Sequence, residues 1–87
     1  MYKNTNKVVV ESAEVVIRVK DSKTDVIKFR HRGTEYKVTK NLSAWKEVTG
    51  DNIITHYHMI CEKICCELAH DHKNNTWTLI QIDNIRV

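Results

Sequence analysis

Two runs of alternating apolar and polar side chains, residues 26–32 and 34–39, flank Gly33 and constrain this chain more than any other feature. Alternation with a period of two is typical of a half-buried β-strand. Gly33 takes positive φ at little cost, which a two-residue hairpin turn at Arg32-Gly33 requires. The sequence therefore predicts a β-hairpin, with the register His31 opposite Thr34, Phe29 opposite Tyr36 and Ile27 opposite Val38.

That register gives the hairpin one apolar face and one charged face. The apolar face carries the rings of Phe29 and Tyr36, whereas the charged face sets Lys28 opposite Lys37. Basic side chains dominate the wider segment, because residues 18–46 carry nine Lys or Arg and three Asp or Glu, while the whole chain has a formal net charge of +3. A domain with its charge polarised in this way is suited to an anionic partner.

Strand-like segments occupy most of the remaining sequence. The candidate segments are residues 8–10, 15–19, 53–61, 64–71 and 77–82. The first two are β-branched runs and could be one bent strand or two. Turn-forming residues separate the others. We therefore predict an all-β fold, a small antiparallel meander of five to seven strands that forms a curved sheet or a partly open barrel.

The alternation breaks after residue 40. Leu42 and Trp45 are three residues apart, as on one turn of a helix, and Asn41 could cap such a turn. We expect at most one short helical turn near residues 42–47, or a bulge, with Trp45 packed on the end of the barrel. The other expected core residues are Ile27, Phe29, Tyr36, Val38, Leu68, Trp77 and Leu79.

The chain of 87 residues fits a single domain spanning 1–87, with residues 1–6 and 84–87 as candidate frayed tails. No apolar run reaches the ~18 residues of a membrane span, and the polar first residues lack the apolar stretch of a secretory signal. The three cysteines are odd in number and crowded into residues 61–66, unlike a disulfide framework. We expect a cytoplasmic protein with reduced thiols and no membrane partner.

Basic side chains of the predicted hairpin are candidate phosphate contacts, namely Lys28, Arg30, Arg32 and Lys37. Small barrels that bind single strands also stack bases on aromatic rings, for which Tyr57 and Trp77 are candidates. A charged face that only solvates an antiparallel sheet explains the same pattern. The leading hypothesis is a non-catalytic interaction module that contacts nucleic acid. The alternative is a protein–protein adaptor or homodimer that uses an exposed strand edge.

Five histidines and three cysteines raise a metal or thiol hypothesis. The weak metal candidates are His56, His58, His70 and His72, with His56 expected roughly across a turn from His70. The sequence holds no Cys-x-x-Cys pair, so we expect no metal and no cofactor. Thiol chemistry would need a base beside Cys61 or Cys65, with His58 or His70 in reach. A glycine-rich loop and an oxyanion platform are absent from the sequence, so we expect no enzyme.

In four motifs the chain resembles a family of small, β-rich bacterial proteins of unassigned function. The motifs are Phe29-Arg30-x-Arg32-Gly33-x-x-Tyr36-x-Val38, Leu42-x-x-Trp45-x-Glu47, Glu67-Leu68-x-x-Asp71 and Trp77-x-Leu79, in that order. The resemblance spans residues 26–83. It implies a bacterial, β-rich domain, and it hints at nucleic acid by association, because relatives are sometimes encoded beside, or fused to, DNA-repair polymerases.

Three histidines depart from the family pattern. His31 stands where the family has tryptophan, and His58 and His70 stand where it usually has arginine. These departures favour polar-face residues over zinc ligands. They also weaken a phosphate grip, because imidazole is mostly uncharged at neutral pH.

Overall fold

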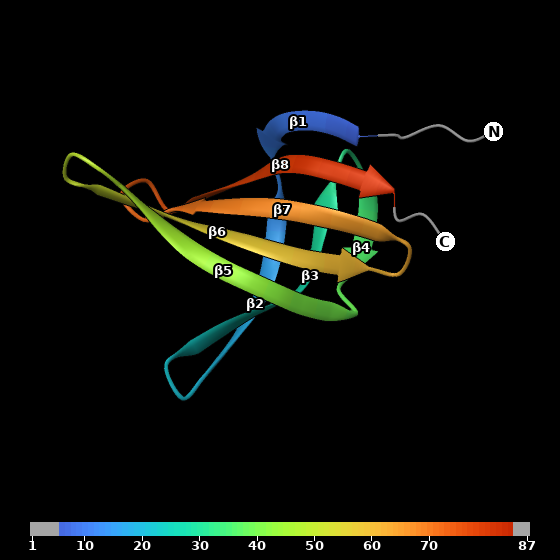
Figure 1. The fold of residues 1–87 in the computed structure, drawn as a ribbon, viewed down its shortest axis with the longest axis horizontal. Helices are drawn as coiled ribbons and strands as arrows, with labels where there is room; N and C mark the ends of the chain where they lie inside the picture. The colour runs from blue at the N-terminus through green and yellow to red at the C-terminus, as the bar shows by residue number, and fades with distance from the viewer. Residues whose placement is uncertain (1–5, 85–87) are drawn as a thin grey trace.

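A computed structural model describes residues 6–84, which form eight β-strands and no helix, arranged as two antiparallel sheets (Figure 1). The strands are β1 (Asn6–Ser12), β2 (Glu14–Lys20), β3 (Lys23–His31), β4 (Thr34–Lys37), β5 (Lys40–Thr49), β6 (Asn52–Cys61), β7 (Ile64–Asp71) and β8 (Thr76–Asn84). The large sheet has the order β1-β8-β7-β6-β5, and the small sheet has the order β2-β3-β4. The all-β prediction is confirmed. The strands number eight, against the five to seven expected, and they form two sheets without a closed barrel.

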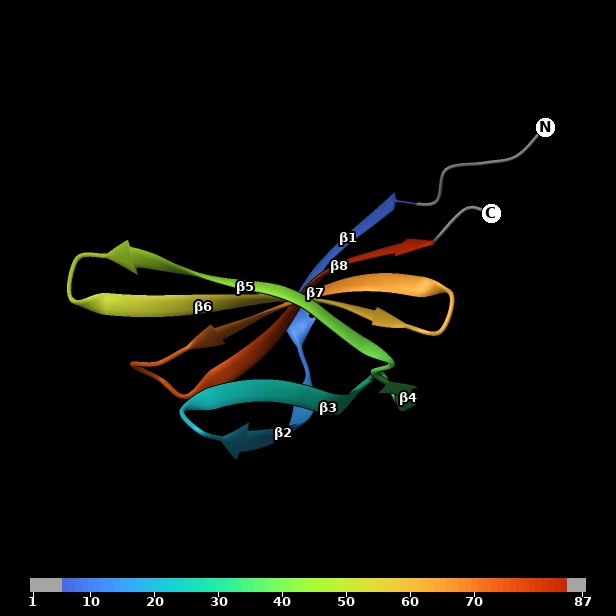
Figure 2. The same cartoon turned by 60° about the horizontal axis from the view of Figure 1, so that its bottom comes forward.

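The small sheet lies against one face of the large sheet, and its strands run across those of the large sheet (Figures 1 and 2). The chain passes between the sheets at two points. Ala13 separates β1 from β2, and its N–H bonds to the carbonyl of Trp77 at 3.1 Å. After β4, Val38 donates to Ile27 at 3.0 Å and Thr39 donates to Ile60 at 2.8 Å. The β-branched runs near the N-terminus are therefore two strands, one in each sheet.

The predicted hairpin is present as β3 and β4, with Phe29 opposite Tyr36 and the two rings stacked at 4.8 Å between centroids. Arg32 (φ 51°) and Gly33 (φ 79°) both lie in the left-handed region, as a type I′ turn requires. A second turn of this kind, at Asp21-Ser22, joins β2 to β3. It is shorter than the turn-rich composition of residues 21–25 suggests.

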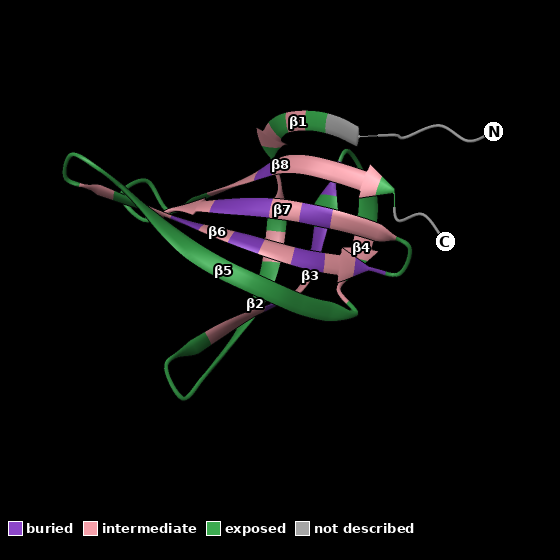
Figure 3. Ribbon diagram, viewed as in Figure 1, coloured by how far each residue is buried: buried purple, intermediate pink, exposed green. Residues whose placement is uncertain are grey.

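The core lies between the sheets and is built from residues of β3, β6, β7 and β8 (Figure 3). Its fully buried side chains include Phe29, Met59, Leu68 and Leu79. Burial of each such side chain stabilises the fold by roughly 1.5–3 kcal/mol. Of the expected core residues, Phe29, Leu68 and Leu79 are buried, and Tyr36, Val38 and Trp77 are partly buried against them. The placement of Ile27 in the core is wrong, because the register of β3 shifts at this position and Val26 is buried in its place.

The prediction of a helical turn near residues 42–47 is wrong, because β5 is extended throughout and holds only a bulge at Leu42. Trp45 is also not in the core: it is 45% exposed and stacks on His56. Pairing with β6 decides both outcomes, since a ten-residue ladder outweighs the weak preference of one i, i+3 pair. Among residues 6–84 there is no helix long and apolar enough to cross a membrane.

Candidate interaction surfaces

One charged surface covers the outer side of the small sheet, and we call it the basic face. Because side chains alternate along a strand, the same side of β2, β3 and β4 receives six cations and three carboxylates. The cations are Arg18, Lys20, Lys23, Lys28, Arg30 and Lys37, and the carboxylates are Glu14, Asp25 and Glu35. The register thus adds Arg18, Lys20 and Lys23 to the predicted set. The composition of residues 21–25 indicates a turn of that length, which hides these three cations. A turn at residues 21–22 alone would have predicted them on the same face.

Ion pairs on the basic face are long and partly exposed. Lys28 lies 3.6 Å from Glu35, Arg30 lies 3.8 Å from Glu14, and Arg18 lies 3.7 Å from Asp25. Pairs of this kind contribute about 0–1 kcal/mol each, so the cations exchange partners readily. Lys37 is exposed and has no ion pair within the described part of the chain.

Arg32, the fourth predicted phosphate contact, lies apart from the basic face. Its guanidinium donates to Glu11 of β1 at 2.6 Å, and Nε2 of the buried His31 lies 2.7 Å from the other oxygen of the same carboxylate. These bonds, from Arg32 first and His31 second, hold the pKa of Glu11 below its ordinary value. Arg32 therefore ties the hairpin turn to the large sheet, beside a pocket of about 360 Å³ that Tyr36 also lines.

The two aromatic residues proposed as a stacking platform do not reach the basic face. Tyr57 is buried in the core, and Trp77 packs beside it with 5.3 Å between ring centroids. The alternation of β6 and β8 points both rings between the sheets. Both rings are packing residues of the core, and neither is a candidate to stack bases beside the hairpin cations.

Strand β5 forms one edge of the large sheet, and all ten of its residues are exposed (Figure 3). Its apolar side chains include Leu42, Trp45 and Val48, which are 42%, 45% and 71% exposed. An edge strand of this length presents a row of backbone N–H and C=O groups with no ladder partner.

His56 and His58 project from β6 on the outer side of the large sheet. The two ring nitrogens of His56 lie 3.0 Å from Glu67 and 3.0 Å from Glu47, so His56 links β7 to the edge strand. Nε2 of His58 lies 2.9 Å from Sγ of Cys65. The fold thus brings together Cys65 and His58, one of the thiol–histidine pairs considered from the sequence.

His70 and His72 lie on the other side of the sheet from His56. The turn sets Cys61 opposite Ile64, so His56 faces Ala69 and His70 faces Thr55. The expectation that His56 and His70 lie across from each other is therefore wrong. The strand register differs by one residue from the expected one, which puts His70 on the opposite face of the sheet from His56.

The rings of His70 and His72 are 4.5 Å apart, and each has a polar partner of its own. Nε2 of His70 lies 2.9 Å from Asn75, and Nε2 of His72 lies 2.7 Å from Thr55. Within residues 6–84, no three His, Cys, Asp or Glu side chains are grouped so that they could hold a metal ion.

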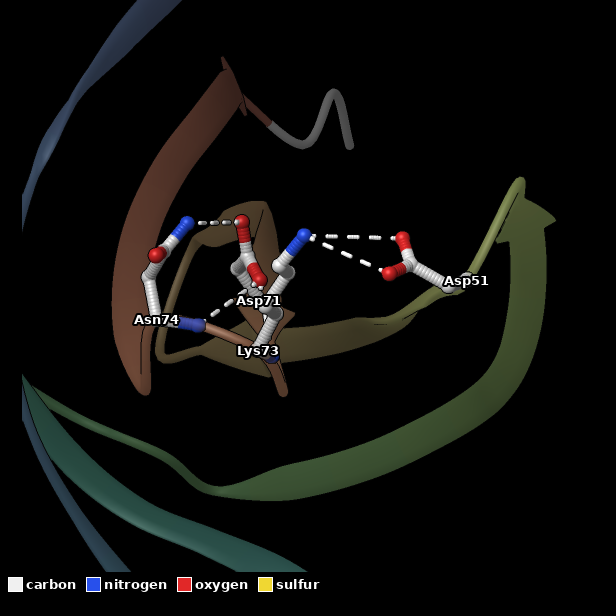
Figure 4. Close-up of polar contacts among 4 residues, drawn as sticks. All are labelled: Asp51, Asp71, Lys73 and Asn74. Atoms are coloured by element: carbon white, nitrogen blue, oxygen red, sulfur yellow. Dashed lines mark hydrogen bonds and ion pairs between the residues drawn. The ribbon is translucent and has the colours of Figure 1, made fainter.

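The tips of the two long hairpins in the large sheet are joined by polar contacts (Figure 4). One oxygen of Asp71 accepts the backbone N–H groups of Lys73 and Asn74 at 3.0 and 3.2 Å, and the other accepts the Asn74 amide. The Lys73 ammonium reaches Asp51 of the neighbouring turn at 3.5 Å. Hydrogen bonds, first that from the backbone of Asn74, lower the pKa of Asp71. These hydrogen bonds hold the asparagine-rich turn to the end of β7.

Comparison with known proteins finds no matching family model, no similar curated protein and no similar solved structure.

Proposed function

We propose that this protein is a non-catalytic interaction module that binds nucleic acid through the basic face. The observation that carries the proposal is the imbalance of six cations against three carboxylates on one side of a three-stranded sheet. This surplus equals the formal net charge of the chain, which leaves eight groups of each sign for the rest of the sequence. We also propose a cytoplasmic location, on the basis of three free cysteines.

Such a face would recognise the phosphate backbone rather than the bases. Lysine and arginine release counterions when they neutralise phosphates, and that term is independent of sequence. The weak pairs at Lys28 and Arg30 can open toward a phosphate at little cost. The basic face carries no aromatic side chain, so stacking and base selectivity are not expected.

The test is a salt titration of binding to a fluorescent single-stranded oligonucleotide. In the triple variant Lys20→Gln, Lys23→Gln and Lys37→Gln, we expect weaker binding at about 50 mM salt. Because each phosphate contact contributes roughly 0.7 to the slope on a single strand, the log–log salt slope should fall by about 2. The matched control is Lys40→Gln, Lys63→Gln and Lys73→Gln, which removes the same charge from the large sheet and its turns.

Two results would overturn the proposal. One is the absence of binding by the natural sequence at low salt. The other is an equal loss of affinity in both triple variants, since net charge alone would then explain the attraction.

The edge strand supports a second candidate function, self-association by strand addition at β5. The open edge of β5 is available to a second copy of the same strand. A two-fold axis perpendicular to the sheet sets residues 43–49 of two copies antiparallel and leaves out the bulge at Leu42. The exposed apolar side chains of Trp45 and Val48 lie within this segment. A second copy is therefore the partner that we propose for this edge.

A further inference from the structure

Cys65 differs from the other two cysteines in its exposure and in its partner. Cys61 and Cys66 are 4% and 1% exposed and pack in the core, whereas Cys65 is only partly buried on the outer side of the large sheet. Its Sγ lies 2.9 Å from Nε2 of His58 on the neighbouring strand. A thiol within hydrogen-bond reach of an imidazole has the geometry of a nucleophile beside its base.

Access to this pair is through a pocket of about 240 Å³. Its lining includes His58, Cys65, Glu67 and Asp83. The register places Asp83 directly across from Cys65, and the Gln81 amide holds both oxygens of Asp83 at 3.2 Å. A small reagent that reaches the sulfur therefore passes two carboxylates, and a positive charge on it is favoured.

The proton of the thiol has a defined acceptor. Burial first, and the Asp83 carboxylate second, raise the pKa of Cys65, so the sulfur carries its proton at neutral pH. In the tautomer that carries the ring proton on Nδ1, Nε2 of His58 accepts the hydrogen bond of the S–H group. Reaction at sulfur needs this proton to move to His58 as the new bond forms.

We propose that Cys65, with His58 as its general base, undergoes thiol–disulfide exchange with small cationic disulfides. The Cys65 sulfur attacks one sulfur of the reagent and the S–S bond of the reagent breaks, so a mixed disulfide forms on Cys65. The thiol proton passes to His58 and then to the departing thiolate, which leaves as a neutral thiol. The reagent is the oxidant and is reduced to one thiol, so the step needs no other electron acceptor.

This reaction is independent of the nucleic-acid proposal. The basic face belongs to β2, β3 and β4, whereas Cys65 and His58 lie on the outer side of the other sheet. A mixed disulfide there leaves the basic face unchanged.

The experiment compares three small symmetrical disulfides of opposite or no charge: cystamine, 2-hydroxyethyl disulfide and dithiodiglycolate. Adduct formation on the full chain is followed by intact mass, the site is assigned by peptide mapping, and each rate is divided by that of N-acetylcysteine. We expect Cys65 to react first, with cystamine faster than dithiodiglycolate by about tenfold or more. Asp83→Asn should reduce this charge preference.

His58→Gln should slow all three reagents by at least about tenfold, because a positioned base typically contributes 10²–10⁴-fold. The variant should leave the relative order of the three reaction rates unchanged. A pocket that is only loosened would change that order. The matched control is His70→Gln, which removes an imidazole from the other side of the sheet and should leave the rate unchanged. Equal rates in the His58→Gln variant and the natural protein would overturn the proposal, and so would earlier reaction at Cys61 or Cys66.

Discussion

At the scale of single residues, the side chain of Asn41 takes the place of a missing strand residue. Its amide accepts the Val26 N–H at 3.1 Å and donates to the Val26 carbonyl at 3.2 Å. This exchange of two bonds matches that between paired residues of an antiparallel ladder. Val26 is 1% exposed and lies beyond the end of β4, so its backbone would otherwise be buried without a partner on that side. Asn41 therefore joins the two sheets.

Replacing Asn41 with alanine should destabilise the fold by about 1–3 kcal/mol, because a buried N–H and a buried C=O lose their partner. The measurement is urea denaturation, with Ser43→Ala on the same strand as the control. Asn41→Asp should also destabilise the protein, since a carboxylate cannot donate to the Val26 carbonyl. Midpoints for Asn41→Ala and Ser43→Ala that coincide would contradict this role.

At the scale of elements, β5 is the strand whose surroundings match its sequence least. It pairs with β6 on one side, and its other edge is open within the part of the chain that is described. Proteins usually protect such edges with charges, proline or bulges. Here the bulge at Leu42 interrupts only one end, and residues 44–49 remain a regular, exposed strand. That segment is the one we propose to pair with a second copy.

A lysine added to the open edge tests that pairing. The mass from light scattering should rise with concentration from 10.2 kDa toward twice that value. Val48→Lys should stay monomeric, because a lysine on an open edge opposes the addition of a second strand. The control is Val19→Lys at an exposed position of the small sheet, which should associate as the natural sequence does. Association by Val48→Lys, or a natural sequence with constant mass, would exclude this interface.

At the scale of the whole molecule, two sheets are held together by their core and by a polar clasp. Glu11 of β1 is bonded to both Arg32 and His31 of the hairpin, 21 and 20 residues away along the chain. These contacts fix the hairpin turn, at the end of β3, against the large sheet. The bonds of Asn41 to Val26 hold the first half of β3. The core and the clasp together set the angle at which the small sheet presents its basic face.

The clasp should make stability depend on pH. Folding lowers the pKa of Glu11 below its ordinary value of 4.5, so the unfolded chain binds the proton more readily. The stabilisation is complete above the unfolded value and is lost as the pH falls through the folded value. Glu11→Gln should therefore be less stable at pH 7 and should lose less on acidification. Urea midpoints at pH 7 and about pH 3 measure this difference.

Glu14→Gln is the control for this pH dependence, because Glu14 has only a long, exposed contact with Arg30. It should lose stability on acidification as the natural sequence does. An acid sensitivity of Glu11→Gln equal to that of the natural sequence would rule out the clasp.

The sequence by itself determined the local structure that depends on period and turn chemistry. Alternation around Gly33 was sufficient for the hairpin, for its register and for Phe29 stacking on Tyr36, because a two-residue turn admits only one pairing. The same parity put Lys28, Arg30 and Lys37 on one side. These features follow from geometry within a few residues of the turn.

Only the tertiary structure decided which segments meet across the two sheets. β1 pairs with β8, Asn41 bonds to Val26, and Glu11 withdraws Arg32 from the basic face. These contacts join residues far apart in sequence, and no local period encodes them. Trp45 was expected to pack on the end of a barrel, but its pairing with His56 puts it on the outer side of the large sheet, in an edge strand with one strand neighbour. The burial of a side chain depends on its neighbours in space, and those neighbours come together only when both sheets have formed.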